Sequence, residues 1–174
     1  MINIQGTSVY LRAPEQSDVE LMYKWENNTK VWQVSNTIVP FSRFVLEQYL
    51  LNAHLDIFTN KQLRLFICTQ QHEAVGCIDL FDFEPLHHRA GIGIFVSEEH
   101  RNKGFADDAL KTVIKYCFEV LLLKQVYCNV GGTNEASLQL FEKNKFKKIG
   151  LKKQWIRVAL NKFEDEWLLQ RINK

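Results

Sequence analysis

The segment from residue 98 to 111, EEHRNKGFADDALK, constrains the fold more than any other stretch of the chain. It follows an apolar run that contains glycines (89–96), and it leads into a segment (106–123) with apolar side chains at helical spacing, Ala109, Val113, Cys117 and Leu121. A strand, a tight turn and a long amphipathic helix are therefore predicted in direct succession. Such a turn presents backbone N–H groups at a helix N-terminus, where unpaired donors and the helix dipole favour an anion.

The turn has the pattern R-x-x-G-x-A, formed by Arg101, Gly104 and Ala106. Gly104 lets a ligand approach the backbone and Ala106 keeps the start of the helix narrow, while Arg101 and Lys103 add positive charge at the rim. Taken alone, the pattern is equally compatible with an ordinary solvated loop. The chain contains neither GxxxxGK[ST] nor GxGxxG, so a Walker A loop and a Rossmann fingerprint are both excluded.

The order of the remaining elements predicts a single α/β (α+β) domain over residues 1–174, with a mixed, mostly antiparallel sheet. The pattern lacks the repeated strand–helix alternation of a doubly wound fold. Strands are predicted over 8–13, 64–69, 74–83, 89–96, 124–130, 155–160 and 166–172, with the last two as a closing hairpin, and helices over 15–27, 41–54, 106–123 and 134–144.

Composition limits the classes of function. The chain has 174 residues, a formal net charge of +2 and 46% hydrophobic residues, which fits one globular domain and argues against a histone-like nucleic-acid binder. The short basic run 143–148 is interpreted as a solvated helix end. No signal peptide and no apolar stretch of roughly 20 residues is visible, so a cytoplasmic protein without membrane contact is expected. The four cysteines lie in apolar stretches and are predicted to be buried free thiols, Cys68, Cys77, Cys117 and Cys128.

The order of motifs resembles the acyl-CoA-binding core of the GNAT N-acetyltransferase superfamily. It runs from a glycine-containing strand through the R-x-x-G-x-A turn, a long helix and a strand to N-x-x-S and L-F-E-K. The resemblance extends from Arg12 to the C-terminus and is sharpest over 89–150. Within the superfamily the chain is most similar to the branch of ribosomal-protein N-terminal acetyltransferases and bacterial spermidine acetyltransferases, through YLRAPEQSD, LFDFEPLHHRAGIGIFVSEEHRNKGFA and NEASLQLFEKNKF. It implies a GNAT-like sheet of about six or seven strands with helices on both faces.

The resemblance also implies where acetyl-CoA binds. Backbone N–H groups of the turn hold the pyrophosphate, the strand 89–96 pairs with the pantetheine arm, and that strand splays from 125–130 to open a slot. Side chains of the following helix line the far side of the slot. The expected contacts are Ile94, Phe95, Val96, Arg101, Asn102, Lys103, Gly104, Phe105, Ala106, Asn134, Ser137 and Phe141.

The implied chemistry is direct transfer of an acetyl group to a primary amine in a ternary complex, with a backbone N–H near Val96 as oxyanion donor. The family usually places a proton-donating tyrosine where this chain has Phe141. Three explanations stay open: another donor such as Ser137, Tyr127 or water acts instead, the thiolate leaves unprotonated, or the protein is an acyl-CoA-binding sensor or interaction module with weakened or lost catalysis.

The general base and the amine are less defined by the sequence. Many relatives have a glutamate where this chain has Gly91, which leaves Asp82 or Asp79 as candidate bases. Strand alternation predicts that Asp79 faces away from Asp82. Trp32 and Glu26 are candidate substrate-binding residues.

The spermidine enzymes have an acidic pair before a proline in the region where this chain reads Ile38-Val39-Pro40, which weakens a polyamine assignment. A polyamine, another small amine or a protein N-terminus stays open as acceptor. Homo-oligomer formation is also open. No metal site is indicated, because the adjacent His87 and His88 point apart in a strand.

Overall fold

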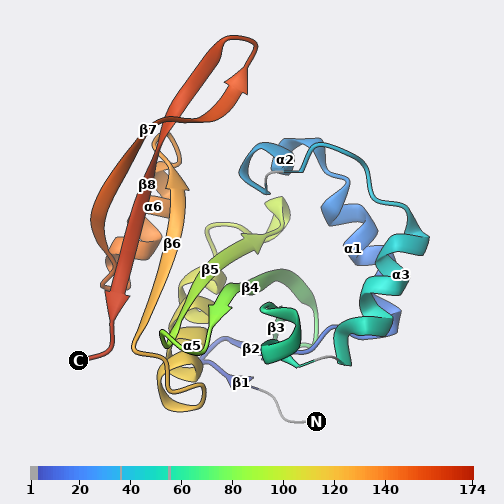
Figure 1. Ribbon diagram of the computed structural model, residues 1–174. Coiled ribbons are helices and arrows are strands. Elements are labelled where there is room, and N and C mark those ends of the chain that lie inside the picture. The colour runs from blue at the N-terminus through green and yellow to red at the C-terminus, as the bar shows by residue number, and fades with distance from the viewer. Residues whose placement is uncertain (1–3, 36, 55) are drawn as a thin grey trace.

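The computed structural model describes residues 4–35, 37–54 and 56–174, and folds them around one eight-stranded sheet (Figure 1). The sheet has the order β1-β2-β3-β4-β5-β6-β8-β7. Its strands are β1 (Ile4–Gln5), β2 (Val9–Arg12), β3 (Leu63–Thr69), β4 (Ala74–Glu84), β5 (Arg89–Val96), β6 (Gln125–Gly131), β7 (Lys147–Ala159) and β8 (Lys162–Ile172). The helices are α1 (Val19–Glu26), α2 (Thr29–Ser35), α3 (Arg43–Leu51), α4 (Ile57–Asn60), α5 (Phe105–Glu119) and α6 (Glu135–Lys143).

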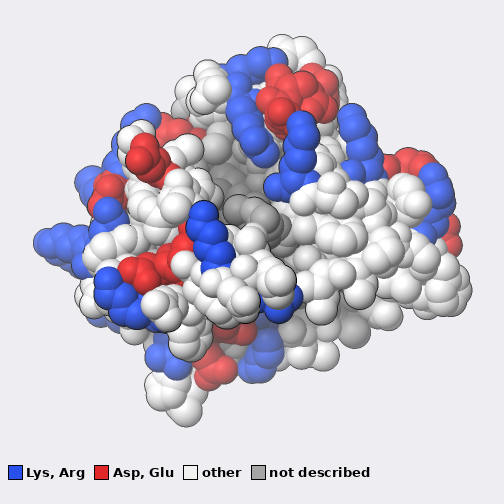
Figure 2. Space-filling model, turned by 90° about the horizontal axis from the view of Figure 1, so that it is seen from above, with Lys and Arg blue, Asp and Glu red and all other residues white. Residues whose placement is uncertain are grey.

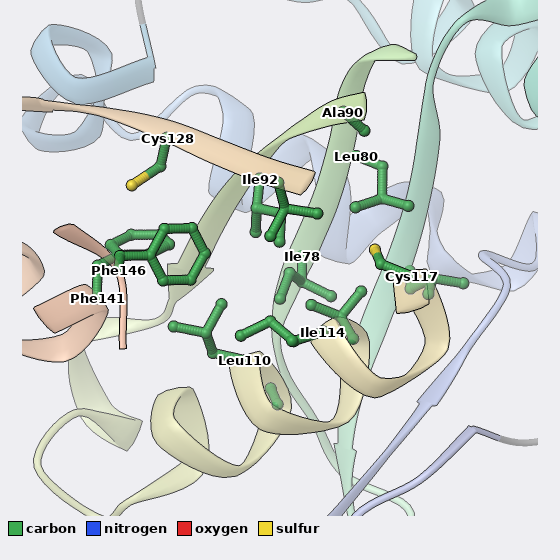
Figure 3. Packing of buried hydrophobic residues seen from close by; sticks show 14 of the residues in the cluster. Ile78, Leu80, Ala90, Ile92, Leu110, Ile114, Cys117, Cys128, Phe141 and Phe146 are labelled. Carbon is green, nitrogen blue, oxygen red and sulfur yellow. The ribbon is translucent and has the colours of Figure 1, made fainter. Parts of the chain in front are cut away.

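The two faces of the sheet carry separate helix layers. Apolar residues of α5 and α6 pack on one face in the larger core, which includes Leu110, Ile114 and Phe141 (Figure 3). On the other face α1 and α3 form a smaller core in which Trp25 stacks on Phe66 at 5.5 Å. Because alternate residues of a strand point to opposite faces, each central strand supplies side chains to both cores.

The predicted architecture is confirmed: the sheet is mixed and mostly antiparallel, with helices on both faces. Within the described residues β5 and β6 are the one parallel pair. The sheet has eight strands against the expected six or seven because β1 spans two residues, too few for a periodic signal. Residues 1–3, 36 and 55 of the predicted 1–174 domain lie outside the described residues.

The C-terminal hairpin is longer than predicted. Strands were expected over 155–160 and 166–172, whereas β7 already begins at Lys147 and β8 at Lys162. The helix-end interpretation of 143–148 is therefore wrong for its second half. Helix α6 ends at Lys143, Lys145 has φ 66°, and the buried Phe146 turns the chain into β7. Register shifts within β7 break the alternation that would have revealed the strand.

The start of α1 is fixed by an ion pair within the segment YLRAPEQSD. The two terminal nitrogens of Arg12 donate to the Asp18 carboxylate at 2.7 and 2.8 Å, and the guanidinium lies 5.1 Å from the centre of the Phe66 ring. The Asp18 carboxylate also accepts the backbone N–H of Glu15 at 2.7 Å. This contact therefore ties β2 to the helix layer that covers one side of the site described below.

Candidate functional site

Strands β5 and β6 separate partway along their length, as the sequence predicted, and the region between their diverging parts is called the slot below. They pair at Arg89–Gln125, Ala90–Val126 and Gly91–Tyr127, and the register stops there. Figure 1 shows the two strands diverging from this point. The part of β5 beyond Gly91 is therefore an edge that faces the slot.

The backbone N–H groups of that edge alternate between β4 and the slot. The Ser97 N–H donates to the Val75 carbonyl at 2.9 Å, on the β4 side. Since successive N–H groups of a strand alternate in direction, those of Val96 and Ile94 point to the slot. An extended chain lying in the slot would meet donors there at the spacing of a strand.

The turn between β5 and α5 ends in backbone that requires glycine. Gly104 has φ 84°, and a Cβ placed there would meet no atom within 4 Å. Glycine is thus demanded by conformation, and the space in front of the turn is open. Asn102 also has a positive φ, 61°, which Asn tolerates better than most residues. The first N–H groups of α5 follow directly, and they have no acceptor within the helix.

Two side chains hold the turn against β5. Arg101 Nε donates to the Val96 carbonyl at 3.2 Å. The imidazole of His100 bridges the Ser97 hydroxyl (Oγ to Nδ1, 2.8 Å) and the Glu73 carboxylate (Nε2 to Oε1, 3.2 Å). Sequence reasoning missed His100, because its partner Glu73 lies in the β3–β4 turn and only the folded sheet brings the two together.

β6 leads through a short turn into α6, whose first residues were expected to line the far side of the slot. Asn134 is the N-cap of α6, and its side-chain oxygen accepts the Ser137 N–H at 3.2 Å. Phe141 is 2% exposed, and its ring packs edge-on against Phe146 with centroids 5.0 Å apart (Figure 3). Phe141 is thus a core residue whose ring has no hydroxyl to offer the slot.

On the face of the sheet that carries α1 and α3, alternate residues of β5 form the floor of a second region, at positions 91, 93 and 95. A Cβ on Gly91 would lie 2.3 Å from the ring of Phe81, so this ring covers Gly91. A Cβ on Gly93 would have one neighbour within 4 Å, Phe81 Cε1 at 3.9 Å. Phe95 packs edge-on against Trp25, with centroids 5.5 Å apart. The space over Gly93 is therefore open and lies between two aromatic groups.

Arg64 joins two of the predicted acidic residues beside this space. Its Nε and Nη2 donate to the two oxygens of Asp79 at 2.8 Å each, and Nη1 pairs with Glu26. Asp79 is the cross-strand partner of Gly93. Burial alone disfavours the charged guanidinium, but its hydrogen bond to Asp79 and the two carboxylate charges raise the pKa of Arg64 above its ordinary value. Asp79 and Glu26 are thus anchored residues, each with its charge already engaged.

Asp82 has a different environment. It lies at a β-bulge with φ 47°, so the simple alternation that predicted Asp79 and Asp82 on opposite faces is interrupted there. The Tyr127 hydroxyl donates to its carboxylate at 3.1 Å, and the Tyr127 ring meets Phe81 edge-on at 5.8 Å. Burial, together with the charge of Asp82 and this hydrogen bond, raises the pKa of Tyr127 to about 12. A protonated hydroxyl and an exposed carboxylate therefore lie where β5 and β6 part.

Trp32 lies in α2 and contacts the end of α1. Its indole N–H donates to the Glu26 carbonyl at 2.7 Å, and the residue is half-buried. The structure therefore brings Glu26 and Asp79 together on Arg64, with Trp32 bonded to the backbone of Glu26, whereas Asp82 is held by Tyr127.

Figure 2 shows the molecule from the end at which the strands diverge. Both basic and acidic side chains lie on this face, so neither sign of charge covers it alone. Across residues 4–35, 37–54 and 56–174, no helix is long and apolar enough to cross a membrane.

In this sheet the parallel strands β5 and β6 separate, and a turn that requires glycine leads into the long helix α5. Together these features define the fold of an acyl-CoA-dependent N-acetyltransferase. The sequence profile of the acetyltransferase (GNAT) domain matches residues 8–147, and the chain belongs to this family.

The relatives include spermidine N(1)-acetyltransferase of Vibrio cholerae, which is 27% identical over 140 residues, 79% of this chain and 78% of the relative. The solved structure of the V. cholerae enzyme in complex with CoA and spermine superposes with a TM-score of 0.86 at 23% identity, covering 95% of both chains. A dodecameric structure of the V. cholerae enzyme gives 0.76 at 24% identity, over 95% and 94% of the two chains. At these identities the structural matches establish the fold.

Proposed function

We propose that this N-acetyltransferase transfers the acetyl group of acetyl-CoA to a small primary amine, by direct attack within a ternary complex. The observation that carries the proposal is the free edge of β5, which turns the N–H groups of Ile94 and Val96 toward the slot and leads into the turn at Gly104. The solved V. cholerae relative in complex with CoA and spermine supports both substrates.

The turn between β5 and α5 fits acetyl-CoA, because the space in front of Gly104 is open where the first N–H groups of α5 begin. Backbone N–H groups from Asn102 to Ala106 would hold the pyrophosphate, with Arg101 and Lys103 at the rim. The arm would follow the free edge of β5, opposite Asn134 and Ser137. The Val96 N–H is the proposed donor to the carbonyl oxygen of the thioester as negative charge develops there.

The amine would approach over Gly93, from the face that carries α1 and α3. Its nitrogen forms the amide bond while the carbon–sulfur bond breaks, and the incoming ammonium loses two protons overall, one of which ends on the CoA thiol. We assign the first proton to Asp82, directly or through water, because Asp79 is clamped by Arg64. Tyr127 holds Asp82 in place, and Tyr127 or Ser137 replaces the family tyrosine that is absent at Phe141.

The test measures acetylated product and released CoA with purified protein, acetyl-CoA and a panel of amines: spermidine, diamines, monoamines and N-terminal peptides. Acetylation of at least one small amine, with saturation by both substrates and intersecting double-reciprocal plots, is expected. Parallel plots would indicate an acyl-enzyme and contradict direct transfer.

A second candidate is an acyl-CoA-binding sensor, which the apolar side chain of Phe141 favours. Thermal stabilisation by acetyl-CoA without turnover on any amine would support it. The dodecameric V. cholerae relative supports the expectation of a homo-oligomer, which light scattering on the purified protein measures directly.

A further inference from the structure

We infer that Phe81, packed over Gly91, selects the acceptor, and that the site takes a monoamine with an aromatic or other apolar group in preference to a polyamine. The inference rests on the proposed acetylation of a small amine and specifies the class of that amine.

The first argument is steric. The ring of Phe81 occupies the volume into which any side chain at position 91 would extend, since a Cβ there would lie 2.3 to 2.7 Å from three ring atoms. The open space over Gly93 is thereby bounded by the half-buried Phe81 on one side and by Phe95 with Trp25 on the other. A flat or apolar group fits between such faces, because aromatic pairs gain from edge-on or offset contact.

The second argument is electrostatic. Asp79 and Glu26 share the guanidinium of Arg64, so the three groups leave a single net negative charge next to the open space. Their side chains are only 17–21% exposed, which limits how far they can turn to other cations. Arg64 thereby leaves this cluster one negative charge instead of two to offer to the further ammonium groups of a polyamine. A polyamine carries several ammonium groups, which this residual charge balances only in part.

The third argument is the position of Asp82. The Tyr127 hydroxyl directs this carboxylate to the place where β5 and β6 part, and the Tyr127 ring is itself packed against Phe81. When the apolar group of the acceptor lies over Gly93, its amine nitrogen lies near Phe81 and Tyr127, which also surround the proposed base Asp82. Phe81 borders the open space over Gly93 and also contacts the ring of Tyr127. Substitution of Phe81 therefore tests the inference.

The experiment compares kcat/KM for phenethylamine, hexylamine and spermidine at saturating acetyl-CoA. In the unchanged protein we expect both monoamines to exceed spermidine by about tenfold or more, the range that one pocket contact supplies. Phe81→Ala should lower kcat/KM for phenethylamine about tenfold more than the value for spermidine, because only the aromatic amine loses the ring contact. The matched control is Phe58→Ala, because Phe58 is an exposed ring that packs on Phe83, away from the acceptor face.

A second variant adds a gain of function. In Phe81→Ala/Gly91→Glu the removed ring makes room for a carboxylate beside Gly93, and kcat/KM for spermidine should rise above that of Phe81→Ala. Binding of acetyl-CoA by each variant, measured by thermal shift, verifies that the fold is retained.

The possible results separate the two proposals. Acetylation of spermidine with higher kcat/KM than both monoamines overturns the inference and leaves the proposed function intact. The same holds if Phe81→Ala lowers the values for all three amines by one factor. If no amine is acetylated, the proposed function itself fails, and the inference fails with it.

Discussion

Gly104 has the backbone conformation on which the proposed binding of acetyl-CoA by the turn depends. Its φ of 84° costs an L-residue about 1–2 kcal/mol, although the space around it is open. We expect Gly104→Ala to be destabilised by that amount. We also expect its KM for acetyl-CoA to rise about tenfold, since a shifted turn loses a charge-assisted hydrogen bond to phosphate.

Gly150 is the matched control, because a Cβ there also meets nothing within 4 Å and its φ is not in the left-handed region. Steady-state kinetics and urea unfolding of Gly104→Ala and Gly150→Ala separate the effect of the strained backbone conformation from the effect of an added methyl group. Equal KM values for acetyl-CoA in the two variants would contradict a role of this turn in binding.

Tyr127 is the residue on which the proposed proton transfer depends. Its hydroxyl stays protonated across the neutral and mildly alkaline range, because burial and the charge of Asp82 raise its pKa to about 12. Tyr127→Phe removes the donor that orients Asp82, so we expect kcat to fall by about 10²-fold, the lower end of general acid–base effects. The KM for acetyl-CoA should change little. A kcat within a factor of two of the original would exclude Tyr127 from the mechanism.

Phe141 allows a complementary measurement. If Tyr127 or Ser137 already supplies the proton, Phe141→Tyr should change kcat by less than about threefold, since a second donor adds little to a step already assisted. In the Tyr127→Phe background the same substitution should partly restore kcat. A gain of about 10²-fold in the otherwise unchanged protein would instead show that the general acid is simply missing.

At the scale of elements, Asp108 fastens the N-terminal strands to α5. Its carboxylate accepts the backbone N–H groups of Thr7, Ser8 and Val9 at 3.1, 2.6 and 3.0 Å. We expect Asp108→Asn to lower the free energy of unfolding at pH 7 by about 1–3 kcal/mol, because an amide oxygen cannot satisfy three donors. Denaturant unfolding measures this loss.

The pH dependence of that loss has a defined sign. Burial alone would raise the pKa of Asp108, but the backbone hydrogen bonds from Ser8, Thr7 and Val9 lower it overall. A depressed folded-state pKa contributes stability above the unfolded value near 3.9, and this is lost as the pH falls further. The difference between Asp108→Asn and the original protein should therefore shrink below about pH 4.

Elements with strong local signals were predictable. The spacing of Ala109, Val113 and Cys117 marks α5, and all three are fully buried. β7 was mostly missed because its lysines and register shifts hide the alternation, and α2 because seven residues give few turns of periodicity. Contacts between distant segments, such as Arg64 with Asp79 and Glu26, were beyond the sequence, since only the sheet register and helix packing bring these charges together.

At the scale of the whole molecule, the sheet consists of two parts joined at three residue pairs. The β1–β5 part and the β6–β8 part meet at Arg89–Gln125, Ala90–Val126 and Gly91–Tyr127. The larger core spans both parts, with α5 and α6 on the same face. Motif order indicated this arrangement in advance, because the parting of two parallel strands is a property of the family fold. The consequence for dynamics is that a ligand in the slot bridges the two parts.

Amide hydrogen exchange tests this bridging at single residues. The N–H groups of Ile94 and Val96 point into the slot, whereas those of Gly93 and Phe95 point to β4, with which β5 pairs along this stretch. Addition of CoA should therefore slow exchange at Ile94 and Val96 at least tenfold more than at Gly93 and Phe95, because new hydrogen bonds form only on the slot side. Neighbouring residues of one strand thus serve as internal controls against a general stabilisation. Uniform slowing along β5 would show that CoA stabilises the fold without pairing to this edge, and would place the arm elsewhere.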